Sequence, residues 1–332
     1  MRFHLTEEQV AIQDAVRGTL ADAWPMERLH KFADAGDDFD ADCWSALSQL
    51  GLFGILAPDS GMGLVDAALV SEVVGEAAAP GPVIAQLIAV AALSATANTA
   101  AKAHLDALLS GEAIATLALD GDLVQCARAA TLFLADDGAG GLRLVEAGEG
   151  VTIETVTATD RSRPVSRVAF SASATSHALF AAGDPQVARL RDAALVLIAA
   201  DALGGAQHCT DVSVAYAKER TQFGQPIGRF QGLKHQLAHM ALDVEPARAQ
   251  VWYAAYAWDA GLPDSPRAAA MAKAHLCEVY TRTTRAAIAA HGGIGYTWEY
   301  GLNYWFRRSV QDRAWLGSPS VLRARAAELA GW

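Results

Sequence analysis

The sequence predicts an α–β–α protein of 332 residues, with an N-terminal α-helical domain at 1–111, a small β domain at 112–185 and a C-terminal α-helical bundle at 186–332. Three observations lead to this order. Apolar residues recur at helical spacing in the first part. Short runs with two-residue alternation, separated by glycine-rich turns, occupy the second part. The helical spacing then returns and continues to the end of the chain.

The N-terminal domain begins with a helix signal. Thr6 precedes two acids and is a credible N-cap, and the apolar residues Val10, Ile12, Val16 and Leu20 are predicted to lie on one broad face. A second helix is predicted to end at Gly51. The stretch "PVIAQLIAVAALSAT" is apolar nearly all round, which predicts a helix in the interior.

The middle and last parts follow from the same patterns. The runs "AIATLAL", "ATLFLAD", "LRLVEA", "VTIETVTAT" and "VSRVAFSA" predict a small antiparallel β unit. In the bundle, one helix is expected to have an apolar face formed by Leu233, Leu237, Met240, Ala241 and Val244. The segment "AGLPDSP" (260–266) should end that helix and start the next.

Composition limits the partners that we expect. A hydrophobic content of 52% is ample for a buried core. The net charge is −11 and no Lys or Arg run is dense enough to follow a phosphate backbone, so we expect no nucleic-acid partner. The longest apolar stretches, such as 193–206, are too short to span a bilayer, and no signal peptide is evident. Four widely spaced cysteines fit reduced thiols, so we expect a cytoplasmic protein.

The sequence "HQLAH" places His235 and His239 one helical turn apart, which is the spacing of two zinc ligands. Gln236 stands where a zincin requires a glutamate, and no third ligand is evident nearby. We therefore predict no metal site. The motifs for nicotinamide binding, phosphoryl transfer and the α/β-hydrolase nucleophile are also absent from the sequence.

Two C-terminal stretches stand out from the helical background. In "ERTQFGQPIGRFQ" (219–231), Arg220 ends a helix, a Gly/Pro-rich turn follows, and Phe230 and Gln231 start the next helix. In "AAHGGIGYTWEYGLNYWFRR" (289–308), paired glycines allow close approach of the backbone, and free amides at such a turn suit a phosphate. Each stretch taken alone favours a structural connection between helices over a functional site.

Together, the two stretches resemble the C-terminal domain of acyl-CoA dehydrogenases, which are flavoproteins. The helical N-terminal region and the β middle occur in that family's order, so the resemblance covers essentially the whole chain. It implies an acyl-CoA dehydrogenase-like fold: an N-terminal α-helical domain, a reduced β domain and a C-terminal four-helix bundle. In the family, FAD lies between subunits, and the neighbour's C-terminal domain contacts its pyrophosphate and adenosine.

The resemblance assigns the flavin contacts to particular positions. A guanidinium can pair with pyrophosphate oxygens at two points, and glycine amides can approach the phosphates. Ala289 stands at a position where the family usually has Gln, which weakens one expected contact. The matching residues are Arg220, Gln222, Phe223, Phe230, Gln231, His291, Gly292 and Gly293.

The family's catalytic base has no counterpart. That base is a glutamate, which takes the α-proton of an acyl-CoA while the β-hydrogen leaves as hydride to the flavin. It belongs to a "YEGT"-like segment, which reads "WLGS" here, so that Leu316 replaces it. The alternative position of some members, about 26 residues before Arg220, is Ala194. We therefore predict no catalytic residue in this chain.

The β segment is also depleted. The "TEPxxGSD"-like loop and the "Trp-Ile-Thr/Ser"-like strand of full-length members do not occur between 112 and 185. The chain thus resembles the short subunits of α₂β₂ heterotetrameric acyl-CoA dehydrogenases of actinobacterial sterol side-chain degradation. In those enzymes a longer partner supplies the glutamate and the β domain, and would hold most of the acyl-CoA. The resemblance implies an FAD shared with that partner and a chain that is inactive alone.

Two other hypotheses remain open at this stage. The chain could be a catalytically dead homo-oligomer that serves as a binding or scaffold protein. Alternatively, it could be a different enzyme on the same fold that uses a residue such as His291 or Asp312.

Overall fold

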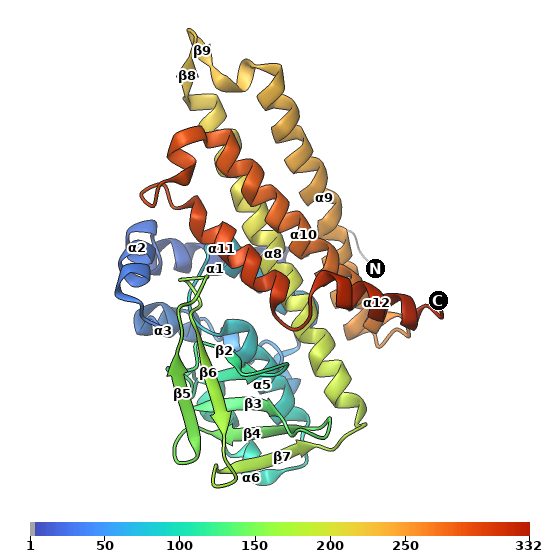
Figure 1. Ribbon diagram of the computed structural model, residues 1–332. Helices are drawn as coiled ribbons and strands as arrows, with labels where there is room; N and C mark the ends of the chain where they lie inside the picture. Colours follow the sequence, from blue (N-terminus) through green and yellow to red (C-terminus); the bar gives the residue numbers. More distant parts are fainter. Residues whose placement is uncertain (1–3) are drawn as a thin grey trace.

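The computed structural model describes residues 4–332, and it has the predicted α–β–α order. Figure 1 shows the N-terminal helices in the middle and lower parts of the molecule and most of the strands in the lower part, with three long helices rising to a narrow far end that carries β8 and β9. The N-terminal part contains α1 (Glu7–Ala23), α2 (Met26–Ala35), α3 (Ala41–Gln49), α4 (Leu64–Glu76), α5 (Val83–Ala95), α6 (Thr99–Lys102) and α7 (Leu105–Leu109), with short 3₁₀ turns η1 (Leu52–Gly54) and η2 (Pro58–Ser60).

Two local predictions for this part are confirmed. The Thr6 hydroxyl accepts a hydrogen bond from the Gln9 amide, and the Gln9 side chain accepts one from the Thr6 amide, which is a capping box. Helix α5 is buried on nearly every side. One prediction is wrong: Val10 is 44% exposed, because α1 packs through Val16 and Leu20 instead.

The strands form two small sheets. One has the order β1 (Ala115–Ala118), β3 (Leu132–Asp136), β4 (Leu142–Glu146), β7 (Ser176–Phe180), and the other β2 (Leu123–Gln125), β6 (Val165–Phe170), β5 (Val151–Thr155). The prediction of a purely antiparallel unit is wrong in one place, since β1 and β3 pair in parallel. Between them the chain passes through β2 in the other sheet, so it returns to the first sheet in its original direction.

The C-terminal part is built around α8 (Pro185–Glu219), α9 (Gln231–Asp259) and α10 (Ser265–His291), with α11 (Leu302–Ala314) and α12 (Pro319–Leu329) packed against them. Helix α8 runs from the strands to the far end of the molecule (Figure 1). As predicted, α10 begins at the "PDSP" segment. On α9, Met240 and Val244 are buried but Ala241 is exposed, so the predicted apolar face is narrower than expected.

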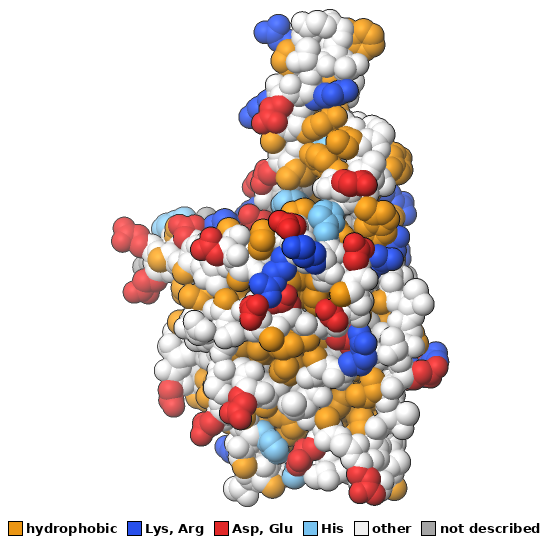
Figure 2. All heavy atoms as spheres, turned by 90° about the vertical axis from the view of Figure 1, so that its left-hand side faces the viewer, with side chains coloured by type: hydrophobic (Ala, Val, Ile, Leu, Met, Phe, Trp, Pro, Cys, Tyr) orange, Lys and Arg blue, Asp and Glu red, His pale blue; other side chains and the backbone are white. Residues whose placement is uncertain are grey.

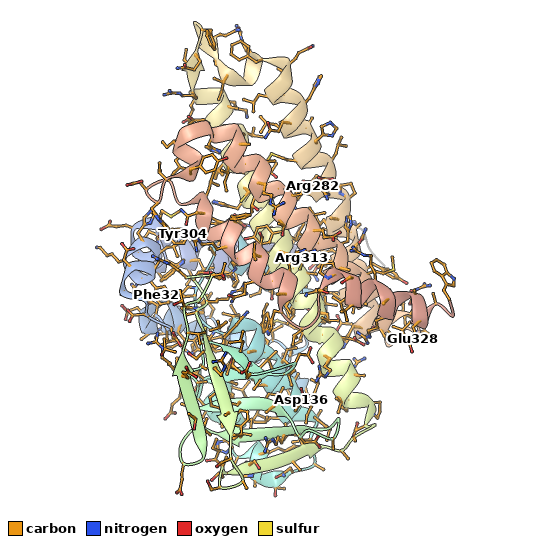
Figure 3. The ribbon with its side chains drawn as sticks, in the orientation of Figure 1. Phe32, Asp136, Arg282, Tyr304, Arg313 and Glu328 are labelled. Atoms are coloured by element: carbon orange, nitrogen blue, oxygen red, sulfur yellow. The ribbon has the colours of Figure 1, made fainter. Side chains whose placement is uncertain are left out.

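Close helix contacts join this part to the N-terminal part. A Cβ added to Gly204 of α8 would lie 1.7 Å from the Glu72 carbonyl oxygen of α4, and one added to Gly75 would lie 2.0 Å from the Asp201 carbonyl oxygen. Only glycine therefore permits this crossing. Tyr304 of α11 extends towards α2, where its hydroxyl lies 2.8 Å from His30 Nδ1 (Figure 3).

The structure also bears on membrane insertion and on cysteine chemistry. Within residues 4–332, no helix combines the length and apolarity that crossing a bilayer requires. All four cysteines are buried and free. Burial raises the pKa of the Cys43, Cys126 and Cys277 thiols to about 12, which keeps them protonated and unreactive at neutral pH.

Candidate functional site

The first motif forms the far end of the molecule, which we call the tip (residues 219–231 and 291–296). Helix α8 ends as the Arg220 amide donates to the Tyr216 carbonyl at 2.8 Å. A short hairpin follows, in which β8 (Thr221–Gln222) and β9 (Gln225–Pro226) have two residues each. The 3₁₀ turn η3 (Ile227–Arg229) then leads into α9. The Ile227 amide donates to the Arg220 carbonyl at 2.8 Å and closes the loop. The motif is thus a rigid, hydrogen-bonded connection.

The predicted cofactor-binding side chains of this motif point outwards. At the tip, side chains project from the ribbon on several sides (Figure 3). Arg220, Gln222 and Gln231 are exposed, and the Arg220 guanidinium makes no hydrogen bond or ion pair with residues 4–332. Phe223 is 92% exposed at a positive φ of 53°, with its ring edge-on to Phe230 at 6.0 Å. Holding an aromatic ring in solvent on a strained backbone is unfavourable, so it points to a binding role.

The second motif begins with a buried histidine. His291 Nδ1 lies 2.7 Å from the Ala287 carbonyl oxygen, and Nε2 lies 2.8 Å from the Tyr300 hydroxyl. A carbonyl can only accept, so Nδ1 carries the proton and Nε2 accepts from Tyr300. Burial lowers the pKa of His291, which agrees with a neutral ring. The His291 imidazole is therefore fully occupied within the chain, and it is poorly placed for catalysis.

The glycine turn lies next to the first motif. The His291 ring stacks on Tyr216, one helical turn before Arg220, with 4.4 Å between ring centroids. This contact places the η4 turn (Gly292–Tyr296) beside the end of α8. Gly292 and Gly293 are exposed, and a Cβ added to either would meet no atom within 4 Å. The two sequence motifs thus form one open site with accessible backbone.

The apolar side chains around this site are unusually exposed. Figure 2 shows the tip standing clear of the rest of the molecule, with hydrophobic side chains along the column beneath it. Besides Phe223, the exposed apolar residues of the second motif are Ile294 (44%), Tyr296 (75%) and Trp298 (39%). A cluster of this kind marks an interaction surface.

The two positions for the family's base are buried and apolar. Leu316 is 7% exposed and has a φ of 53°, in the loop between α11 and α12. Lys273 fixes this loop, because its Nζ donates to the Trp315 carbonyl at 2.6 Å and to the Gly317 carbonyl at 2.5 Å. Ala194 is fully buried in α8. Neither side chain can accept a proton.

The space between the strands and the bundle holds a buried ionic cluster. Arg308 of α11 donates to both Asp201 carboxylate oxygens, at 3.0 and 2.5 Å, and to the Ala79 carbonyl at 2.8 Å. Arg163, which precedes β6, donates to Asp312 at 2.5 Å and lies 3.5 Å from Asp160. All five charged side chains are essentially inaccessible to solvent.

The balance of charges in this cluster affects which carboxyl group takes up a proton. Two guanidinium groups face three carboxyl groups, so full ionisation would leave a buried net negative charge. Burial, together with the charge of Asp201, raises the pKa of Asp312 to about 8 even though Arg163 opposes this. Burial also acts on Asp201, but Arg308 and Arg163 outweigh it and lower its pKa to about 2. Asp312 is therefore the carboxyl group of the cluster that takes up a proton most readily, and its protonation balances the charges of the cluster.

Little free space remains beside the cluster. The cavity lined by Trp315, Arg308, Asp201, Arg163 and Gln125 has a volume of about 10 Å³. A volume of that size holds one water molecule at most. The space between the ionic cluster and Trp315 is thus closed to a ligand.

Comparison with known proteins identifies the family. The models for the acyl-CoA dehydrogenase N-terminal and C-terminal domains match residues 6–112 and 192–330. The chain is 30% identical to acyl-CoA dehydrogenase IpdE2 of Mycolicibacterium smegmatis, over 98% of this chain and 100% of that protein. This chain belongs to the acyl-CoA dehydrogenase family. IpdE2 of Mycobacterium tuberculosis is 33% identical over 97% of this chain and 98% of its own length.

Solved structures of the family have the same fold. The steroid acyl-CoA dehydrogenase Tcur3481–Tcur3483 (G363A variant) matches with a TM-score of 0.88 and 26% identity, over 98% of both chains. The ChsE4–ChsE5 complex of Mycobacterium tuberculosis matches with a TM-score of 0.91 over 100% of this chain and 99% of that chain, at 22% identity. The predicted acyl-CoA dehydrogenase-like fold is therefore confirmed.

Proposed function

We propose that this chain is the short, base-lacking subunit of a heteromeric FAD-dependent acyl-CoA dehydrogenase. In this proposal a longer partner supplies the glutamate base, the full β domain and most of the acyl-CoA site. The short chain contributes its tip to the partner's FAD, in an α₂β₂ assembly. When bound, the flavin accepts the β-hydrogen of the acyl-CoA as hydride.

The observation that carries the proposal is the contrast between two apolar base positions and an open tip. Leu316 and Ala194 cannot act as bases, and about 10 Å³ of free space remains beside the buried ionic cluster. A drug-sized ligand needs a pocket of roughly 300 Å³ or more. The two motifs of the tip are nevertheless adjacent, and most of their residues are exposed: Arg220, Gln222, Phe223, Gln231, Gly292 and Gly293. This combination supports contact with a flavin that another chain holds.

The chemistry of the tip fits a pyrophosphate. Arg220 has a guanidinium without a partner in the described chain, and guanidinium pairs with phosphate oxygens at two points. The exposed Gly292 and Gly293 have no side chain to block a phosphate, so it can approach this turn closely, while the Gly292 amide itself donates to the Ala289 carbonyl. The amide groups of Gln222 and Gln231 add polar contacts for the adenosine end, and Phe223 with Phe230 adds apolar surface. The buried His291 acts by fixing the glycine turn.

The relatives support a partner and a substrate class. Two of the similar structures, the Tcur3481–Tcur3483 steroid enzyme and the ChsE4–ChsE5 complex, carry two protein names each. We infer that the substrate is a bulky, sterol-derived acyl-CoA, held mainly by the partner.

Co-expression tests the proposal. The chain should be purified alone and together with a longer acyl-CoA dehydrogenase from the same genome, and each sample analysed for flavin and for mass in solution. We expect a colourless chain alone, and a stable complex with one FAD per pair of chains. A yellow, active homo-oligomer would contradict the proposal.

The same experiment distinguishes the alternatives. A colourless homo-oligomer that binds no longer homologue would indicate a binding or scaffold protein. A different enzyme that uses His291 or Asp312 is disfavoured, because both ring nitrogens of His291 are engaged and Asp312 is sealed within the ionic cluster.

A further inference from the structure

Three side chains that no sequence motif connects meet at the end of the molecule opposite the tip. His104 lies between α6 and α7, Glu146 ends β4, and His177 lies in β7. Their side chains are partly buried, with exposed fractions of 29%, 36% and 19%. Figure 1 shows α6 and β7 side by side at this end, far from β8 and β9.

Both imidazoles face the same carboxylate oxygen. His177 Nε2 lies 2.7 Å from Glu146 Oε1, and His104 Nε2 lies 3.5 Å from it. One ligand atom from each of the three residues lies within 4.8 Å of the others. Around a tetrahedral zinc ion with bonds of about 2.0–2.2 Å, ligand atoms are about 3.3 Å apart. To enclose an ion, the His177–Glu146 pair must therefore move slightly apart, while the 3.5 Å between His104 Nε2 and Glu146 Oε1 already suits one.

We propose that His104, Glu146 and His177 form a binding site for a divalent transition-metal ion of the zinc class. Two imidazoles and one carboxylate are ligands that Zn²⁺ accepts, and a water molecule would complete a tetrahedral site. On binding, His177 Nε2 gives up the proton that it donates to Glu146, and Nδ1 of the neutral ring carries a proton instead, so that no net proton is released. This inference departs from the sequence-based prediction of no metal site and does not depend on the proposed function.

The surroundings explain what the ion does. Strand β7 is the edge of its sheet, and the segment from Thr96 to His104 covers that edge. The Asn98 side chain donates to the Ala178 carbonyl at 2.9 Å, and the Thr96 hydroxyl donates to the Leu179 carbonyl at 3.0 Å. A metal bound by His104 and His177 would add a third link between this cover and the edge strand. We infer a stabilising role, since the ion binds the folded arrangement and not the unfolded chain.

Zinc titration of the chelator-treated full chain tests the proposal, and the chain offers its own control. His235 and His239 are exposed on α9 at the spacing of a weak two-histidine site. Zn²⁺ binding should be measured by calorimetry, with the thermal unfolding temperature recorded with and without Zn²⁺. We expect one high-affinity ion per chain and a higher unfolding temperature with zinc.

The variants give opposite expectations. His104→Ala and Glu146→Gln should each weaken zinc binding at least about tenfold and abolish the thermal shift. The double variant His235→Ala/His239→Ala should leave both the zinc affinity and the thermal shift unchanged. Circular dichroism and gel filtration must show that each variant is folded, and Glu146→Gln keeps a hydrogen-bonding group in place if His104→Ala does not fold. Equal zinc affinity in Glu146→Gln and the wild type, or loss of binding only in the α9 double variant, would overturn the proposal.

Discussion

At the tip, Arg220 and Phe223 are held in solvent by a hydrogen-bonded turn, whereas at the base positions Leu316 and Ala194 are buried among packed side chains. The side chains of the tip are therefore free to bind a ligand, and few of them contribute to a buried core. The cluster near the Leu316 loop consists of five buried ionisable side chains that bind one another, and the cavity of about 10 Å³ beside them has no room for a ligand. The two regions thus differ in role: the exposed residues of the tip are suited to binding another molecule, and the buried residues near Leu316 stabilise this fold.

The contrast has a physical basis in the cost of burial. Buried ionic groups are tolerated when they are paired and hydrogen-bonded, and removal of one partner leaves an uncompensated charge. Exposed groups at the tip carry no such penalty, so substitutions there should change binding and leave the fold intact. The predictions below test this difference, from the largest expected effect to the smallest.

Arg308→Met should lower the free energy of unfolding by about 3–5 kcal/mol, because the ionised Asp201 would lose its bidentate partner inside the protein. Urea unfolding followed by circular dichroism measures this. Arg307→Met is the matched control. Arg307 is half-buried, and its guanidinium donates one hydrogen bond, to the Thr159 carbonyl at 3.3 Å. Equal losses in the two variants would show that the cluster has no special role.

The pH dependence of stability should reveal the protonated Asp312. The pKa of Asp312 is about 8 in the folded chain and 3.8 in the unfolded chain. Its contribution to the free energy of unfolding is therefore complete below about pH 4 and declines by a few kcal/mol as the pH rises towards 8. Asp312→Asn keeps the group neutral and should remove this decline. Unfolding free energies at several pH values measure the effect. If both proteins lose the same stability between pH 4 and pH 8, Asp312 is ionised throughout.

A pair of glycine variants compares the regions directly. Gly204→Ala should destabilise the chain by about 3 kcal/mol, because its Cβ would collide with the Glu72 carbonyl of α4. Gly293→Ala should change stability by no more than about 0.5 kcal/mol, since a Cβ there meets no neighbouring atom. Thermal unfolding of both variants provides the measurement. A large loss in Gly293→Ala would mean that the turn is structural.

The smallest effect is expected at Ala289, where the family usually has Gln. Ala289 is exposed, and Ala289→Gln adds one possible hydrogen bond to a shared flavin. One such bond contributes about 1 kcal/mol, which is roughly fivefold in flavin affinity. Flavin release from the heteromeric complex should therefore be slower in this variant. Unchanged release would show that position 289 makes no contact with the flavin.

Much of the fold could be predicted from local patterns in the sequence. The Thr6 cap, the all-round apolar α5 and the start of α10 depend on neighbouring residues, and they were identified correctly. The parallel pairing of β1 with β3 was missed, because it depends on where the chain goes between the two strands. Strands β2 and β7 are short, and β7 has polar residues at its start, so neither has a clear alternating pattern.

The candidate site divides in the same way. Its tip residues lie within two short motifs, so the resemblance could assign them before their arrangement was known. The ionic cluster and the His104–Glu146–His177 group could not be found in that manner, because their members are far apart in the chain and only the fold brings them together. The buried state of His291, which assigns it a structural contact with Tyr216, likewise follows only from packing.

The central claim is that Arg220 contacts a flavin held by another chain. Its most direct test is the flavin content of the co-purified heteromeric complex carrying Arg220→Ala, with Lys218→Ala, an exposed cation on the same helix end, as the control. Loss of a charge-assisted contact costs about 1.5–3 kcal/mol, so we expect Arg220→Ala to assemble normally but to bind FAD about 10- to 100-fold more weakly. The Lys218→Ala complex should keep its FAD. A wild-type flavin content in the Arg220→Ala complex would contradict the account.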